Sequence, residues 1–218
     1  MFVDVFHLAI ALIPLALYLI LLGGIHLRGR PFVTTGGKDV AALAIAISGF
    51  AVVGPMELFF PEPAAREIGG LVWVLMMTFY ALCSMLTVLV LKPRLIIYNV
   101  SYERLRPVLG EIVPKLDSDA RWAGECLVLP NLAIQLHLES SSVTRNAQLI
   151  ATGTRQGLEG WKRLESELAA ALRDRNSPRN PLGVSLSIAG VALMCCVLLL
   201  LARDSEAVAQ SLKDWLRR

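Results

Sequence analysis

Four long apolar stretches constrain this chain more than any other feature of its sequence. They contain no Asp, Glu, Lys or Arg, and they run from Val5 to Leu27, Val40 to Met56, Ile68 to Leu91 and Asn180 to Ala202. A helix of about 20 residues crosses a hydrocarbon core about 30 Å thick. Three stretches reach this length, and the second reaches it if it continues past Glu57 to Phe60. We therefore expect four transmembrane helices, the first three at about 5–25, 40–60 and 68–91.

The composition argues against a soluble protein. Hydrophobic residues make up 55% of the chain and charged residues 18%, which lies outside the usual range for a soluble domain of this size. The net charge of +3 is too small to indicate nucleic-acid binding. Cys126 is the one cysteine outside the apolar stretches, so we expect neither a disulfide framework nor a zinc site. No cofactor is predicted.

The distribution of Lys and Arg between short loops predicts the orientation. The loop after the first stretch is basic, whereas the loop from Pro61 to Glu67 contains one arginine among two acids. We expect a multi-pass protein of the bacterial plasma membrane, with the N-terminus outside and residues 92–175 in the cytoplasm. The first stretch lacks a basic n-region, so it is expected to remain as a membrane helix and not to act as a cleaved signal peptide.

The C-terminal tail, residues 203–218, disagrees with this orientation. It would carry four basic residues to the outer face, Arg203, Lys213, Arg217 and Arg218. Two interpretations stay open. Val208, Leu212 and Trp215 fall on one side of a helix, which suits an amphipathic helix on the lipid surface; alternatively, the tail extends the fourth membrane helix.

The polar block between the third and fourth stretches predicts a small α+β domain at 92–175, followed by a linker and the fourth helix at 176–202. Its order is β-α-β-β-β-α, with an antiparallel sheet and helices on one face. Strands are expected at 94–100, 124–129, 131–139 and 144–152, where β-branched or alternating residues occur. Apolar residues at helical spacing predict helices after Ser101, the expected N-cap, and at 158–173. The fold class is thus a membrane all-α bundle with an inserted α+β domain.

One candidate site lies within the second apolar stretch, where Pro55 precedes Glu57. A proline interrupts the backbone hydrogen bonds of a helix, and an acid inside a membrane segment is a functional candidate. On the predicted orientation Glu57 lies toward the same surface as His7, together with Asp4, Glu62 and Glu67. Such a polar cluster would take a proton or cation. The alternative is that Glu57 simply reaches the headgroup region, and no metal site is predicted.

Two further groups of residues are expected to contact other molecules. Gln135, His137 and Glu139 alternate along one predicted strand and would line the open sheet face, as a solvated surface or an interaction face. Lipid headgroups are the expected contacts of four basic residues that flank the membrane helices: Lys92, Arg94, Arg175 and Arg179. The first loop resembles a phosphate-binding loop only superficially, since Phe32 and Asp39 break the required pattern. Asp39 is instead expected to cap the second helix.

No arrangement of residues in the sequence identifies a reaction. Small residues recur at four-residue spacing in the second and fourth helices, and this spacing permits close approach of membrane helices. We therefore expect a non-catalytic accessory subunit or scaffold of the membrane that displays its small domain to a protein partner or to copies of itself. The alternative is an oligomeric proton or cation transport component that uses Glu57. An enzyme acting on a membrane-associated substrate is a third hypothesis.

Overall fold

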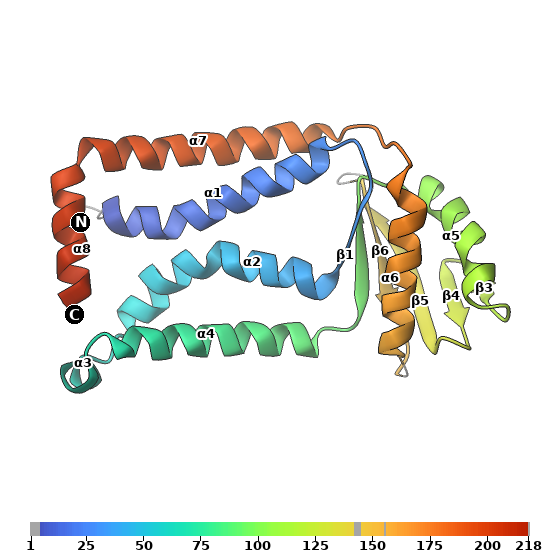
Figure 1. Ribbon diagram of the computed structural model, residues 1–218, viewed down its shortest axis with the longest axis horizontal. Helices are drawn as coiled ribbons and strands as arrows, with labels where there is room; N and C mark the ends of the chain where they lie inside the picture. Colours follow the sequence, from blue (N-terminus) through green and yellow to red (C-terminus); the bar gives the residue numbers. More distant parts are fainter. Residues whose placement is uncertain (1–4, 142–144, 155, 218) are drawn as a thin grey trace. The chain divides into compact units, whose positions relative to one another are not determined.

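The computed structural model describes residues 5–141, 145–154 and 156–217 (Figure 1). The chain divides into two compact units, and each is assembled from separate segments. The helical unit comprises Met1–Leu22, Ala41–Leu89 and Ser185–Arg218, and the sheet unit comprises Gly23–Val40 and Val90–Val184. The sheet unit therefore includes the loop after the first apolar stretch as well as the polar block.

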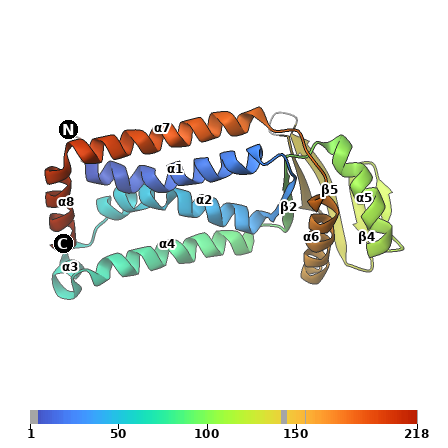
Figure 2. The same cartoon turned by 45° about the horizontal axis from the view of Figure 1, so that its top comes forward.

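Four long apolar helices are present, as the sequence predicts, and each is long and apolar enough to cross a membrane. They are α1 (Val5–Leu27), α2 (Gly36–Ala51) with its π-helical continuation η1 (Val52–Met56), α4 (Leu71–Val90) and α7 (Pro181–Arg203). α7 lies beside α1, and α2 lies beside α4, in both views (Figures 1 and 2). A β-carbon added to Gly190 of α7 would stand 2.9 Å from the Ala16 carbonyl oxygen of α1, so glycine permits this close approach.

At the ends of these helices one prediction was wrong, one short helix was missed, and one of the two interpretations of the tail is excluded. α2 begins at Gly36, so Asp39 lies in its first turn and is not the N-cap; its carboxylate accepts a hydrogen bond of 2.6 Å from the Tyr98 hydroxyl. The loop expected at Pro61–Glu67 contains a short helix, α3 (Glu62–Ile68). The tail is a separate helix, α8 (Ser205–Arg217), which turns away from α7 (Figure 1) and does not extend it.

The sheet unit contains one six-stranded antiparallel sheet in the order β1-β2-β6-β5-β4-β3. Its strands are β1 (Phe32–Thr35), β2 (Arg94–Tyr98), β3 (Arg121–Ala123), β4 (Cys126–Leu129), β5 (Ile134–Ser141) and β6 (Asn146–Ala151). Sequence analysis predicted four of these strands. It missed β3, and it missed β1, which lies in the loop between α1 and α2 and pairs with β2.

Two amphipathic helices cover one face of this sheet, as predicted: α5 (Tyr102–Leu116) and α6 (Leu158–Arg173). Their apolar residues, such as Leu109 and Leu168, share one buried core with alternate residues of the strands, such as Leu95 of β2 and Leu136 of β5. α5 runs without interruption through Pro107 and Pro114. Ser101 occupies the N-cap position, as predicted, although its side chain makes no capping hydrogen bond.

Hydrogen bonds join the first loop to the chain that leads into α7. The Ser177 amide donates to the Gly29 carbonyl at 2.9 Å, and the Asn180 amide donates to the His26 carbonyl at 3.3 Å. Asn99, in the left-handed region with φ of 62°, donates its side-chain amide to the Ile25 carbonyl at 2.8 Å. The first loop is thus a fixed part of the sheet unit.

Candidate functional site

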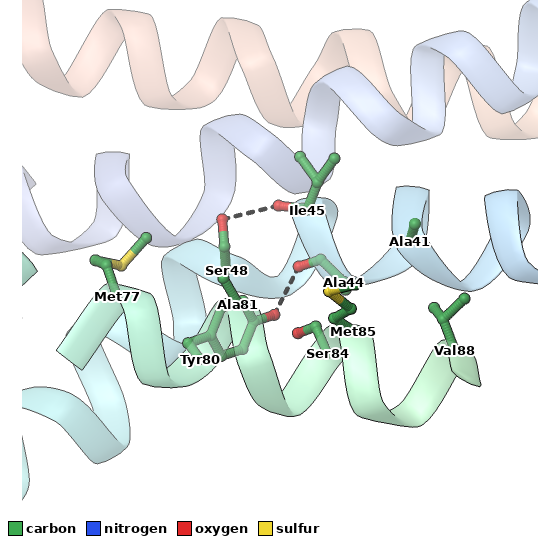
Figure 3. Close-up of a pocket in the computed structure, with 10 residues that line it drawn as sticks. All are labelled: Ala41, Ala44, Ile45, Ser48, Met77, Tyr80, Ala81, Ser84, Met85 and Val88. Carbon is green, nitrogen blue, oxygen red and sulfur yellow. Dashed lines mark hydrogen bonds between the residues drawn. The ribbon is translucent and has the colours of Figure 1, made fainter. Parts of the chain in front are cut away.

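An open apolar groove lies between α2 and α4 and has a volume of about 470 Å³. Ten residues line it (Figure 3): Ala41, Ala44, Ile45, Ser48, Met77, Tyr80, Ala81, Ser84, Met85 and Val88. Five of them are alanine or serine from α2 and α4, including Ala44 and Ala81, and these short side chains form the hollow. The larger Met77, Met85 and Val88 provide apolar contact area along α4.

The polar groups of the groove are largely used by the helices themselves. The Tyr80 hydroxyl donates a hydrogen bond of 2.6 Å to the Ala44 carbonyl of α2, and the Ser48 hydroxyl donates one of 2.8 Å to the Ile45 carbonyl (Figure 3). The Tyr80 bond joins the two helices along one wall. The surface that the groove offers to a ligand is therefore mainly apolar and hollow at its centre. Such a surface suits the side chains of another apolar helix better than a charged or reactive substrate.

The helices that form the groove bury few of their residues within the chain. In the most apolar 18-residue windows, 17% of residues are buried in α2 with η1 and 6% in α4. Large side chains of α4 such as Phe79 and Leu89 are each 69% exposed. An apolar surface this extensive requires either lipid or a partner around it.

The structure brings two of the predicted site residues together. His7 Nε2 of α1 lies 3.1 Å from Glu57 Oε1, so a proton on Nε2 would be donated to the carboxylate. Pro55 lies in η1, two residues before Glu57, and the π-helical turn forms where the missing N–H of Pro55 breaks the regular hydrogen-bond ladder. π-Helical turns occur frequently at functional sites.

The rest of the predicted polar cluster is described only in part. Asp4 and the side chain of Glu62 lie outside the described residues, and Glu67 is exposed in α3. Within the described parts of the chain, no group of three or more His, Cys, Asp or Glu could hold a metal ion. The His7–Glu57 pair is therefore a polar contact between α1 and the end of the second apolar helix.

The open face of the sheet carries the predicted polar residues on β5. Gln135 and Glu139 are exposed and His137 is half-buried. His137 is paired across the strands with Cys126, with 3.6 Å between Nδ1 and Sγ, and its Nε2 lies 3.8 Å from Glu125 Oε2. Sequence analysis gave Cys126 no role, because only the register of β4 and β5 reveals this neighbour. The three groups lie together on the open face of the sheet.

The four predicted headgroup contacts have different environments. Lys92 and Arg179 are exposed. Arg175 pairs with Glu111 of α5 at 2.8 Å. Arg94 packs so closely against Gly36 that a β-carbon there would overlap its side chain, and its Nε is buried without a hydrogen-bond partner among the described residues. Arg94 therefore packs within the sheet unit.

Asp117 is a buried acid that sequence analysis did not single out. It is 3% exposed and lies at the end of α5. Burial by itself raises the pKa of this carboxyl, but hydrogen bonds from the Asp119 amide, from the Asn131 amide and side chain and from the Leu132 amide together lower the pKa below its ordinary value. The two Asn131 bonds are 2.8 and 2.7 Å long. Asp117 thus holds the turn between β4 and β5 in place.

No protein-family model matches the chain, and neither curated proteins nor solved structures give a match. The function is therefore argued from the structural features described above.

Proposed function

We propose that this chain is a non-catalytic membrane protein, an accessory subunit that receives a transmembrane helix of a partner protein in the groove between α2 and α4. The observation that carries the proposal is the groove itself: an open apolar hollow floored by alanine and serine on two sparsely buried helices. Small residues let helix backbones approach closely, and in lipid this packing is a main source of association energy.

The pairing of β1 with β2 supports a definite membrane topology. β1 follows α1, and β2 follows α4, yet the two strands share one antiparallel ladder. If the four apolar helices span a membrane, both strands must lie on one side, so α2 and α4 cross in opposite directions. Arg28 and Arg30 in the first loop and Lys92 before β2 favour the cytoplasmic side. We therefore propose a multi-pass protein of a bacterial plasma membrane with a cytoplasmic sheet unit.

The test is affinity purification of the tagged chain from its host in a mild detergent, comparing two alanine-to-tryptophan variants. Ala81→Trp places an indole in the groove, where Ala81 is already exposed, so folding is expected to be preserved. Ala42→Trp is the matched control, because Ala42 is also exposed on α2 but does not line the groove. We expect Ala81→Trp to lower recovery of a stoichiometric partner by about tenfold, the effect of about 1.4 kcal/mol.

The control must retain the partner for the proposal to stand. Equal losses in both variants would indicate that the apolar surface as a whole binds the partner and would contradict a specific groove. A chain that elutes alone and monomeric from its native membrane would contradict the accessory-subunit proposal itself.

A second candidate function, an oligomeric proton or cation transport component, is favoured by the His7–Glu57 contact beside η1. A single acid in four helices makes a narrow pathway, so this function needs several copies of the chain around it. In liposomes, Glu57→Gln would abolish a proton or potassium flux, whereas Glu67→Gln, which alters an exposed acid of α3, would leave it unchanged. A flux equal in the wild type and in Glu57→Gln would remove this candidate.

A further inference from the structure

Three arginines from two separate parts of the chain line one pocket of the sheet unit. The pocket has a volume of about 630 Å³, and Arg28 and Arg30 contribute to it from the first loop and Arg173 from the last turn of α6. Its remaining lining includes Phe32 and Val33 of β1 and Ala169 of α6. We propose that this pocket binds the phosphate group of an anionic membrane lipid.

The loop that carries two of these arginines has a fixed backbone. The Arg30 carbonyl accepts a hydrogen bond of 3.4 Å from Asn99, and the Gly29 carbonyl accepts one of 2.9 Å from the Ser177 amide. On its C-terminal side the loop continues into β1, whose pairing with β2 fixes its register. A fixed loop lowers the entropic cost of gathering several donors around one ligand.

The described part of the chain does not neutralise the positive charge of the pocket. Among the described residues, no acid forms an ion pair with Arg28, Arg30 or Arg173. The nearby Glu165 of α6 is instead paired with Lys38 at 3.0 Å. The C-terminus of α6 contributes a partial charge of about −0.5, which is much smaller than three guanidinium charges. An anion would therefore relieve the repulsion among these arginines.

The residue types identify the anion. Planar guanidinium groups bind phosphate oxygens through paired hydrogen bonds. Arg28 directly follows the last residue of α1, and on the membrane topology proposed above, on which this inference rests, that position lies at the headgroup level. Phe32, which is 38% exposed, offers an apolar contact for the glycerol and upper acyl chain of a lipid. A free phosphate ion would leave this apolar wall unused.

The experiment measures lipid binding to the purified full-length chain in a neutral detergent by native mass spectrometry. The probes are phosphatidylglycerol, phosphatidylcholine and inorganic phosphate. One variant combines Arg28→Gln, Arg30→Gln and Arg173→Gln. Its matched control removes the same charge from exposed residues outside the pocket through Arg104→Gln, Arg121→Gln and Lys162→Gln. A second variant, with lysine at all three pocket positions, keeps the charge but loses the paired hydrogen bonds.

We expect the wild type to prefer phosphatidylglycerol over phosphatidylcholine, and the glutamine variant to lose about tenfold or more in affinity for it. The control should retain binding to within about twofold, and the lysine variant should fall between them. Equal losses of affinity for phosphatidylglycerol in the glutamine variant and the control would overturn the assignment of this pocket as the binding site. Binding of inorganic phosphate without preference for phosphatidylglycerol would overturn the lipid assignment.

Failure of this inference can be distinguished from failure of the proposed function by extracting native membranes at alkaline pH. A chain that remains in the membrane but shows no preference for phosphatidylglycerol overturns the lipid pocket alone. A chain released from the membrane overturns both.

Discussion

At the scale of single residues, Asp117 shows how one buried acid fixes a turn. Its carboxylate accepts hydrogen bonds from Asp119 and Asn131, 2 and 14 positions further along the chain, the shortest of them 2.7 Å. These donors stabilise the ionised form, which is why the pKa of Asp117 is lowered despite its burial.

The lowered pKa predicts how stability depends on pH. The contribution of Asp117 is fully present above the pKa of the unfolded chain, about 3.9, and is lost as the pH falls through the lower folded value. We expect the thermal midpoint of the sheet unit to decrease below about pH 4, measured by circular dichroism of the full chain. Asp117→Asn should lower the thermal midpoint already at pH 7, because its side-chain amide would face the Asn131 donors. The thermal midpoint of this variant should also depend less on pH in the acid range. Asp174→Asn, at an exposed acid, is the control and should follow the wild type.

At the scale of elements, α6 approaches the turn between β4 and β5 through a glycine. A β-carbon added to buried Gly160 would overlap the Leu132 carbonyl oxygen and stand 3.1 Å from the Ile134 side chain. A backbone carbonyl oxygen cannot move aside as a flexible side chain can. Only glycine at position 160 therefore allows α6 to lie this close to the turn.

Two alanine substitutions should therefore have opposite effects. Gly160→Ala is expected to destabilise the sheet unit by on the order of 1–3 kcal/mol through overpacking. Gly110→Ala on α5, where a β-carbon would meet no atom within 4 Å, should stabilise it by about 0.5–1 kcal/mol through helix propensity. Chemical denaturation of the two variants beside the wild type measures both. A destabilised Gly110→Ala, or an unchanged Gly160→Ala, would contradict this account of the packing.

Sequence analysis predicted the elements whose signal is local. The apolar stripe of α5 from Leu105 to Leu116 and the alternation of Ile134, Leu136 and Leu138 each identify a buried face. β3 gives no such signal, because all three of its residues are exposed. β1 has four residues and is a strand by virtue of its pairing with β2, which lies far along the chain. His7 and Glu57 were predicted to lie on one side, but their contact depends on helix packing that no local pattern encodes.

At the scale of the whole molecule, the sheet is not a contiguous stretch of sequence. A fragment containing residues 90–184 would contain β2 to β6 but leave the edge of β2 unpaired, and an exposed strand edge promotes association. We expect this fragment to aggregate or to melt at a lower temperature than a fragment in which residues 29–38 are joined to it through a flexible linker. Size-exclusion chromatography and thermal unfolding compare the two. Equal stability would show that β1 is dispensable for the sheet.

The same pairing governs the order in which this protein can be completed during synthesis. The 58 residues from 36 to 93 separate β1 from β2, and at about 5–20 residues per second their translation takes roughly 3–12 s. During that time β1 has emerged from the ribosome but has no strand to pair with. Closure of the sheet must therefore wait until both intervening apolar helices have been made. A ribosomal pause within α2 or α4 would prolong the time for which β1 is unpaired, whereas in the finished chain it is paired with β2.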